Sequence, residues 1–298
     1  MSTELPFYQI DAFTRVGQVD AFTRVGQVDA FTRVEASVAQ PFTGNPAAVC
    51  PLDAWLPDGL MQAIAMENNL SETAFLVPEG AEFRLRWFTP TREVDLCGHA
   101  TLASAAVVFS HIAPRRIQVE FETRSGTLMV RRAWASEGLP AGSLVMDFPA
   151  LPAVALETVP DDLVAALGAR PVQVLSGRSL VAVFADADTV RELRPDLAAV
   201  SRLETHAVIV TAAGTGRDGD VDFVSRFFAP QQGVPEDPVT GSAHCTLTPY
   251  WAERLGRAGL RARQVSARGG ELACTLEGDR VRLAGTTRLV IRGHFLID

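Results

Sequence analysis

The chain has 298 residues, of which 47% are hydrophobic and 21% are charged, and its net charge is −8. These values are typical of a soluble globular protein with two domains of ordinary size. All 27 basic residues are arginine, which excludes Schiff-base catalysis and the phosphate-binding P-loop, because both require a lysine. The acidic balance and the lack of an arginine-rich stripe argue against nucleic acid or an anionic membrane as a partner.

The sequence predicts neither a membrane span nor an export signal. Its best apolar run, around residues 100–112, is shorter than the roughly 18 residues that a membrane helix needs, and its start lacks the basic segment of a secretory signal. The four cysteines (Cys50, Cys97, Cys245 and Cys274) form no C-x-x-C pair and show no zinc-ligand spacing. We therefore expect a reduced, cytoplasmic protein without a metal site.

A nine-residue unit is repeated near the N-terminus. Asp11–Val19 recurs as Asp20–Val28, and a partial third copy follows at Asp29–Val34. Because nine is odd, one continuous strand would turn each successive copy to the opposite face. The sequence therefore predicts either a bend at the Gly17 and Gly26 turns or a segment left loose. We interpret the extra 18 residues as a recent duplication and not as a functional array.

After the repeats, the first half is predicted to combine strands with two helices. One helix opens at Pro57 and ends near Asn69. The other, from about His99 to Ile112, is apolar on nearly every side, which is typical of a buried central helix. Strands are predicted at residues 47–50, 73–77, 83–88, 117–122, 126–131 and 143–148.

The second half follows the same plan. A helix is predicted near residues 189–200, and a second buried helix begins near Ser242, with Pro249 expected to kink it. The predicted strands are 172–175, 180–184, 207–211, 221–228, 272–276, 281–284 and 289–297.

Together the elements predict an α+β fold with two pseudosymmetric domains, each a β-barrel wrapped around a central helix. The expected first domain is 1–147, joined by the C-terminal strand 288–298, and the expected second domain is 148–287. The halves are related by an offset, because Gly44 falls on Gly177 and the offset of 133 residues holds without a gap to Val77 and Val210. Two units related in this way usually meet face to face, so we expect one shared cleft.

Two glycine turns occupy matching positions in this repeat. Cys97-Gly98-His99 corresponds to Thr240-Gly241-Ser242 at an offset of 143 residues, and each turn leads into a predicted buried helix. Helix N-termini attract anions through free N–H groups and the helix dipole, so a facing pair would hold a carboxylate. The alternative is that each glycine only permits a tight turn. The duplication makes the two interpretations about equal.

One acidic residue breaks the repeat, since Glu72 falls opposite Thr205. A carboxylic acid in an apolar cleft would have a raised pKa suited to proton transfer, although a lone glutamate is more often a solvated or capping residue. Asp237 could be a second acid or a turn residue before a proline. His99 could be an acid/base or a hydrogen-bonding residue at a helix start. Cys97 on its own is more often a small buried hydrophobic residue.

Five ordered motifs resemble the PhzF-like phenazine-biosynthesis isomerase family. They span nearly the whole chain, and they are Tyr8–Thr14, Pro41–Val49, Asn69–Phe75, Asp95–Leu102 and Glu236–Ala243. The resemblance implies the diaminopimelate-epimerase fold and a cofactor-independent isomerase that moves a proton on a small carboxylate-bearing substrate. It also implies that the assembly to consider is a homodimer.

The resemblance also implies roles for individual residues. Glu72 matches the acid/base glutamate of the family, and His99, Asp237 and Ser242 match its other active-site positions. We expect Glu72, His99 and Asp237 to be catalytic. Substrate binding is expected from the two glycine turns, through Cys97, Gly98, Thr240, Gly241 and Ser242.

Two departures keep alternatives open. The family usually has one Asp-Ala-Phe-Thr copy, so the 18 additional residues are foreign to it. Diaminopimelate epimerases use two opposed cysteines, whereas here Cys97 faces Thr240, which weakens two-thiol racemisation. The alternatives are an amino-acid epimerase or dehydratase with Cys97 as a single thiol base, or a non-catalytic metabolite-binding protein. The second is disfavoured because carboxylate binding alone would need only the helix starts.

Overall fold

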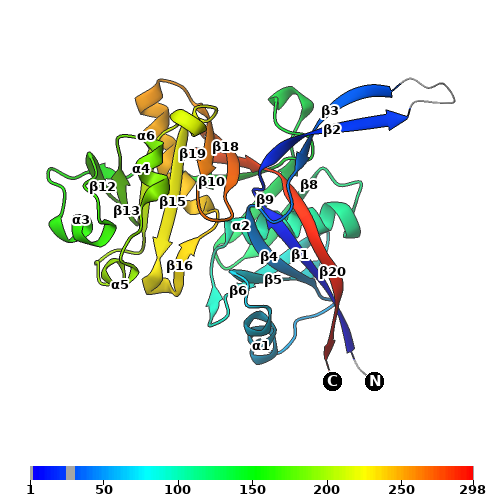
Figure 1. The fold of residues 1–298 in the computed structure, drawn as a ribbon. Coiled ribbons are helices and arrows are strands. Elements are labelled where there is room, and N and C mark those ends of the chain that lie inside the picture. Colours follow the sequence, from blue (N-terminus) through cyan, green and yellow to red (C-terminus); the bar gives the residue numbers. More distant parts are fainter. Residues whose placement is uncertain (1–2, 25–30, 298) are drawn as a thin grey trace.

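The structure, a computed structural model, describes residues 3–24 and 31–297 and is rich in β-sheet with two long buried helices (Figure 1). The α+β class predicted from the sequence is confirmed. No helix within these two ranges is long and apolar enough to cross a membrane. The largest cluster of buried apolar side chains runs through both halves of the chain and includes residues of both buried helices, among them Leu102 and Leu247.

The first half contains the elements up to residue 149. They are β1 (Thr3–Ala12), β2 (Val16–Arg24), β3 (Phe31–Ala39), β4 (Asn45–Pro51), α1 (Asp58–Asn68), β5 (Glu72–Glu79), β6 (Glu82–Phe88), β7 (Glu93–Val94), α2 (Gly98–Val107), the π-helical turn η1 (Val108–Ile112), β8 (Gln118–Thr123), β9 (Gly126–Arg132), the 3-10 turn η2 (Ala135–Glu137) and β10 (Leu144–Pro149).

The second half contains the remaining elements. They are β11 (Val154–Ala155), α3 (Asp161–Leu167), β12 (Gln173–Ser176), β13 (Leu180–Val183), α4 (Ala187–Glu192), α5 (Leu197–Val200), β14 (Val208–Ala213), η3 (Gly216–Asp218), β15 (Phe223–Ala229), η4 (Pro230–Gln232), β16 (Val234–Asp237), α6 (Gly241–Leu255), β17 (Gly259–Gln264), β18 (Gly270–Glu277), β19 (Arg280–Gly285) and β20 (Thr287–Ile297).

The two halves use the same order of strand pairing. In the first, β4 runs parallel to β5, which pairs antiparallel with β6, and β6 pairs antiparallel with β7. In the second, β13 runs parallel to β14, which pairs antiparallel with β15, and β15 pairs antiparallel with β16. The register Ala47↔Glu72 has the counterpart Leu180↔Val208. The sequence offset therefore corresponds to a repeated piece of sheet.

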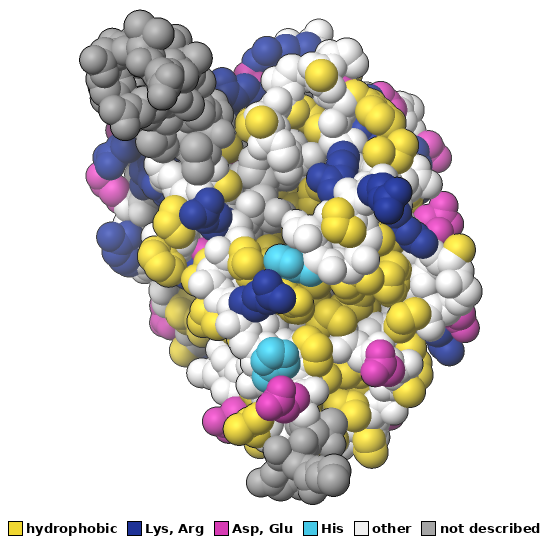
Figure 2. All heavy atoms as spheres, turned by 90° about the vertical axis from the view of Figure 1, so that its right-hand side faces the viewer, with side chains coloured by type: hydrophobic (Ala, Val, Ile, Leu, Met, Phe, Trp, Pro, Cys, Tyr) yellow, Lys and Arg dark blue, Asp and Glu magenta, His cyan; other side chains and the backbone are white. Residues whose placement is uncertain are grey.

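The ends of the chain and the middle strands connect the halves. β20 pairs antiparallel with β1 along nearly its whole length, and β10 pairs with both β9 and β19. Figure 2 shows the face on which β20 lies, where arginines are scattered among apolar and acidic side chains. Its exposed apolar residues include Leu289, Ile291 and Leu296.

Two predicted helices differ from those observed. The helix predicted over residues 99–112 is α-helical only to Val107 and then widens into η1. The helix predicted over residues 189–200 is wrong in extent, because Pro195 separates two short helices. Asp186 caps α4 by accepting a hydrogen bond from Thr189 N at 2.7 Å, and Asp196 caps α5 in the same way.

The N-terminal repeat forms a hairpin that projects from the body (Figure 1). β2 and β3 pair only with each other, in a two-stranded sheet of their own. The predicted bend at Gly17 is wrong, since Gly17 lies inside β2, and Gly26 lies outside the described residues. The chain turns at Phe13 instead, where φ is 56°.

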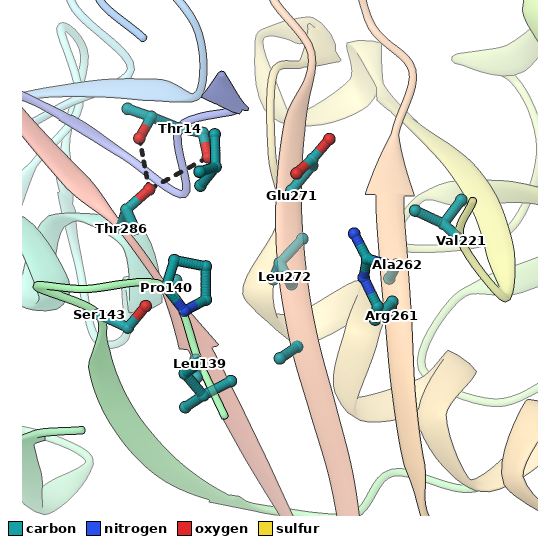
Figure 3. Close-up of a pocket in the computed structure, with 14 residues that line it drawn as sticks. Thr14, Leu139, Pro140, Ser143, Val221, Arg261, Ala262, Glu271, Leu272 and Thr286 are labelled. Carbon is teal, nitrogen blue, oxygen red and sulfur yellow. Dashed lines mark hydrogen bonds between the residues drawn. The ribbon is translucent and has the colours of Figure 1, made fainter. Parts of the chain in front are cut away.

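The first copy of the repeat is part of the core. The Phe13 side chain is fully buried. The buried Asp11 carboxylate pairs with Arg268 Nη2 at 2.8 Å and accepts a hydrogen bond from Phe42 N at 2.9 Å. Thr14 and Thr286 join their hydroxyls at 2.7 Å (Figure 3). These contacts fix one copy in the sheet and leave the added length to the hairpin.

Candidate active site

The N-termini of the two buried helices meet. Gly98 is the first residue of α2 and Gly241 the first of α6. A Cβ added to either glycine would lie 4.0 Å from the Cα of the other, so the two backbones approach closely, as the repeat predicts. Neither helix start is capped by its N-cap side chain, Cys97 or Thr240. The N–H groups of both first turns and both helix dipoles therefore favour an anion at this junction.

Glu72 and His99 lie beside this junction. Glu72 begins β5 and His99 is the second residue of α2. Glu72 Oε2 is 3.2 Å from His99 Nε2, and their side chains are 16% and 6% exposed. The two atoms are close but not aligned for a hydrogen bond, and neither has another partner among the described residues. Buried polar atoms without an aligned partner are uncommon and are characteristic of functional sites.

Asn45, the first residue of β4, connects this pair with the second half of the chain. Its amide nitrogen Nδ2 lies 2.9 Å from Asp237 Oδ1, 3.0 Å from Val239 O and 3.2 Å from His99 Nδ1. Its carbonyl Oδ1 accepts a hydrogen bond from Ser71 Oγ at 3.3 Å. Since Val239 O can only accept, the nitrogen is assigned to this side of the amide.

Asp237 ends β16 and is held from the other side by Thr240 and Gln264. Thr240 Oγ1 donates to Asp237 Oδ2. Gln264 Oε1 accepts a hydrogen bond from Thr240 N at 2.9 Å, and Gln264 Nε2 donates to Asp237 O at 2.7 Å. Gln264 is fully buried. The polar chain therefore runs from Glu72 and His99, through Asn45, to Asp237 and Thr240.

Burial dominates the acidities in this cluster. Burial, assisted by the Glu72 carboxylate, raises the pKa of Asp237 to about 6, although His99 acts in the opposite direction. Burial and the same carboxylate raise the pKa of the Cys97 thiol to about 11. Burial lowers the pKa of His99, but Cys97 and Glu72 outweigh it and raise that pKa above its usual range. At neutral pH the cluster thus holds a neutral thiol and carboxyl groups able to change charge.

The remaining predicted site residues also lie at the helix starts. Ser242 is the second residue of α6 and is exposed. Cys97 Sγ contacts His99 Nδ1 at 3.5 Å. All eight predicted residues thus lie within the short segments 72, 97–99, 237 and 240–242, which the fold brings to one junction.

One set of side chains resembles a metal site in composition. Ligand atoms of Glu72, Cys97 and His99 lie within 4.8 Å of one another. The contacts, however, use opposite sides of the imidazole, because Cys97 meets Nδ1 and Glu72 meets Nε2. One ion binds one imidazole nitrogen, so the three side chains do not converge on a single ion in this arrangement. We assign no metal ligands here.

Sequence reasoning did not assign a role to Asn45, Gln264 or Ser71. Asn45 lies in the quoted motif Pro41–Val49, which was the available signal. Gln264 ends β17, a strand that was not predicted, although Leu260, Ala262 and Gln264 alternate inward along it.

The detected cavity lies elsewhere. Figure 3 shows a pocket of about 70 Å³ between the halves, lined by residues that include Thr14, Ser143, Leu272 and Thr286. None of the predicted site residues lines it. The helix-start junction is therefore defined by its polar contacts and not by this pocket.

The comparisons with known proteins identify the family. The family described as phenazine biosynthesis-like protein matches residues 28–294, so the chain belongs to the PhzF-like family. The match begins just before the third copy of the repeat, whereas the structure places the first copy in the main sheet. Identical copies make the two alignments equivalent for the residues from Asp to Val.

Relatives cover almost the whole chain. An uncharacterized isomerase of Pseudomonas aeruginosa is 54% identical over 267 residues, covering 89% of this chain and 97% of the relative. A phenazine biosynthesis-like domain-containing protein of Homo sapiens is 39% identical over 283 residues, covering 87% and 96%. The crystal structure of a PhzF-family protein from Enterococcus faecalis has a TM-score of 0.84 and 41% identity, covering 98% and 99%.

More distant structures share the fold alone. A hydroxyproline epimerase from Agrobacterium vitis has a TM-score of 0.60 at 10% identity, covering 99% of this chain and 93% of that one. The identity is too low to transfer residues or activity.

Proposed function

We propose that this protein is a cofactor-independent isomerase that moves a proton within a small carboxylate-bearing molecule, with Glu72 as the acid/base. One observation carries the proposal. A buried glutamate oxygen without an aligned hydrogen bond, 3.2 Å from His99 Nε2, lies where two uncapped helix N-termini meet. Membership of a family whose relatives include proteins named as isomerases supports it.

The helix starts at Gly98 and Gly241 would bind the substrate carboxylate. Their free N–H groups and dipoles favour negative charge. When a C–H bond beside a conjugated carboxylate breaks, its electron pair spreads toward that carboxylate. The same N–H groups then stabilise the developing charge without reorganisation.

Glu72 would take the proton as this C–H bond breaks and would return it to another atom of the conjugated system. No electron acceptor is needed, because the electron pair stays in the substrate and the proton returns to it. His99 would hold Glu72 in its reactive ionisation state, and Asp237 would assist from the second half. The 16% exposed surface of Glu72 gives a ligand access to the carboxylate.

A thiol mechanism is the first alternative, with Cys97 as a single base for epimerisation or dehydration. A base must be deprotonated, and burial raises the pKa of Cys97 to about 11. The matching position in the other half is Thr240, which donates its hydrogen bond to Asp237. Both observations favour the glutamate.

We also propose that each half is a barrel-like unit and that the halves are pseudosymmetric. The parallel, antiparallel, antiparallel pairing order repeated in β4–β7 and β13–β16 supports this description. Under it, the substrate would bind between the units.

The proposal is tested by incubating the protein with small unsaturated carboxylates in deuterium oxide without added cofactor. We expect an isomerised product that carries solvent deuterium, detected by NMR and mass spectrometry. A carboxylate that raises the thermal unfolding temperature but never isomerises or exchanges would support the second alternative, a non-catalytic binding protein.

A further inference from the structure

The hydrogen-bond chain also specifies where the proton sits on His99. We propose that Asn45 is a positioning residue that holds the proton of a neutral His99 on Nε2, facing Glu72, and keeps Nδ1 as an acceptor. The importance of this arrangement for proton transfer rests on the proposed function. The arrangement itself is a property of the ligand-free protein.

The first step is the orientation of the Asn45 amide. Asp237 Oδ1 at 2.9 Å and Val239 O at 3.0 Å both need a donor, and Ser71 Oγ at 3.3 Å donates on the other side. A flipped amide would place its carbonyl against two acceptors. The side facing His99 is therefore NH₂, whose two hydrogens serve three acceptors, so one hydrogen is shared.

The second step concerns the atoms around His99 Nδ1. Asn45 Nδ2 is 3.2 Å away and Cys97 Sγ is 3.5 Å away. The amide can only donate, and the thiol stays protonated at neutral pH because the pKa of Cys97 is about 11. Both neighbours thus offer hydrogens to Nδ1, which favours a lone pair there and leaves the ring proton on Nε2.

The third step weighs the opposite tendency, a second proton on the ring. Burial of His99 disfavours its charged form, whereas Cys97 and Glu72 favour it. Cys97 acts in this way only as a thiolate, which it is not at neutral pH. What remains is the charge of Glu72, opposed by burial and by an Asn45 N–H that would point at a new N–H on Nδ1.

The consequence for Glu72 is chemical. An Nε2–H group faces the carboxylate across 3.2 Å and favours its ionised form, the form that can take a proton. A lone pair on Nε2 would instead compete with Glu72 for the substrate proton. Asn45, fixed by Asp237 in the second half, thereby sets a property of the base in the first half.

The chain contains an internal reference for this assignment. His244 is fully buried in α6, and its Nδ1 lies 2.7 Å from Thr240 O, which can only accept. Burial lowers the pKa of His244 to about 4, so the ring is neutral and its proton is on Nδ1. The two buried histidines should therefore show opposite tautomers in one sample.

The test is NMR of the ligand-free full chain labelled with ¹⁵N-histidine, across neutral pH, with signals assigned from His99→Gln and His244→Gln. We expect the proton on Nε2 of His99 and on Nδ1 of His244. A proton on Nδ1 of His99, or on both of its nitrogens, would overturn the inference without any further variant.

Two matched variants separate this role from a purely structural one. Asn45→Leu removes the donor to Nδ1, and Gln264→Leu removes an amide that holds Asp237 and Thr240 but does not contact His99. We expect Nδ1 of His99 to become protonated in Asn45→Leu, and turnover to fall on the order of 10²-fold. Gln264→Leu should leave the His99 tautomer unchanged even if turnover falls. Unchanged His99 signals in folded Asn45→Leu would contradict the proposal.

Loss of this inference and loss of the proposed function are distinguishable. If no carboxylate isomerises but the His99 proton is on Nε2, the function fails and the tautomer stands. If isomerisation occurs with the proton on Nδ1, the function stands and the role of Asn45 fails.

Discussion

The starts of α2 and α6 are built alike but carry different chemistry. Each begins with a glycine, and the two glycines approach each other at the junction of the halves. Around Gly98 the first half supplies Glu72 and His99. Around Gly241 the second half supplies a threonine hydroxyl that donates to Asp237. The shared part gives the geometry of an anion site, and the parts that differ give it an acid/base.

Thr205, the counterpart of Glu72, shows what the same position does without a carboxylate. Its hydroxyl accepts a hydrogen bond from Leu180 N at 3.1 Å and donates to Ala207 O at 3.1 Å. These bonds hold the ends of β13 and β14 together. The repeat therefore uses one copy of this position to support the sheet and leaves the other free for chemistry, under the proposed function.

The largest expected effect separates the two buried histidines. His99→Gln should lower turnover on the order of 10²-fold or more, because the partner of the acid/base is lost. His244→Gln should leave turnover within a few-fold and cost about 1–3 kcal/mol of unfolding free energy, since a buried hydrogen bond to Thr240 O is disturbed. Steady-state kinetics and denaturant unfolding on both variants provide the check. Equal losses of turnover would mean that the two helix starts are not chemically distinct.

The glycine pair can be probed by added methyl groups. Gly98→Ala or Gly241→Ala alone should change the unfolding free energy by less than about 1 kcal/mol, because the nearest atoms to the new Cβ are 3.6 Å and 3.7 Å away. The double variant should lose a further ~1–3 kcal/mol, since each methyl points at the other glycine. Denaturant unfolding of the four proteins gives the coupling, and strictly additive losses would show that the helix starts are farther apart than described.

A control for this cycle is Gly285→Ala. Its Cβ would lie 2.4 Å from Phe13 Cδ1, a distance that requires the buried ring to move. A single substitution there should cost about 1–3 kcal/mol. It would show that the small effect expected at the helix starts is specific to that open junction.

The raised pKa of Asp237 predicts a pH dependence of stability. Its folded pKa of about 6 exceeds the ordinary 3.8, so the folded state binds the proton more tightly than the unfolded state. The stabilisation is fully present below about pH 4 and is lost as the pH rises through about 6. Relative to Asp237→Asn, the wild type should therefore lose about 1–3 kcal/mol over this window. Unfolding at several pH values measures the difference, and a difference independent of pH contradicts the assigned burial.

The smallest effect is expected from the hairpin. Because the copies are identical, removing residues 11–28 or residues 17–34 gives the same sequence, so the copy in the core is kept and most of β2–β3 is lost. The unfolding free energy should change by less than about 1 kcal/mol, since loop length enters only logarithmically. Thermal unfolding of the 18-residue deletion checks this. A large destabilisation would show that β2–β3 supports the body.

Several features could be predicted because their signals are local or repeated. The two buried helices follow from apolar side chains on all faces, and the approach of Gly98 to Gly241 follows from the offset between the halves. The break at Pro195 also had a local signal, because a proline followed by the cap Asp196 ends one helix and starts another.

The contacts that organise the site could not be predicted. Asn45 meets Asp237 across 192 positions of sequence, and a short amide in a turn motif carries no pattern that names a distant partner. Gln264 has the inward position of an alternating strand, but its hydrogen bonds with Thr240 depend on how β17 packs against the start of α6. Such information is tertiary.

The central claim is that Glu72, and not Cys97, carries the proton. Isomer formation and solvent deuterium incorporation should be measured for Glu72→Gln and Cys97→Ser with the same substrate, after ligand-induced thermal shifts show that both still bind. We expect Glu72→Gln to lose on the order of 10²–10⁴-fold in turnover, because it keeps shape and hydrogen bonding but cannot take the proton. Cys97→Ser should lose much less. Turnover that survives in Glu72→Gln and disappears in Cys97→Ser would contradict the account and establish a thiol base.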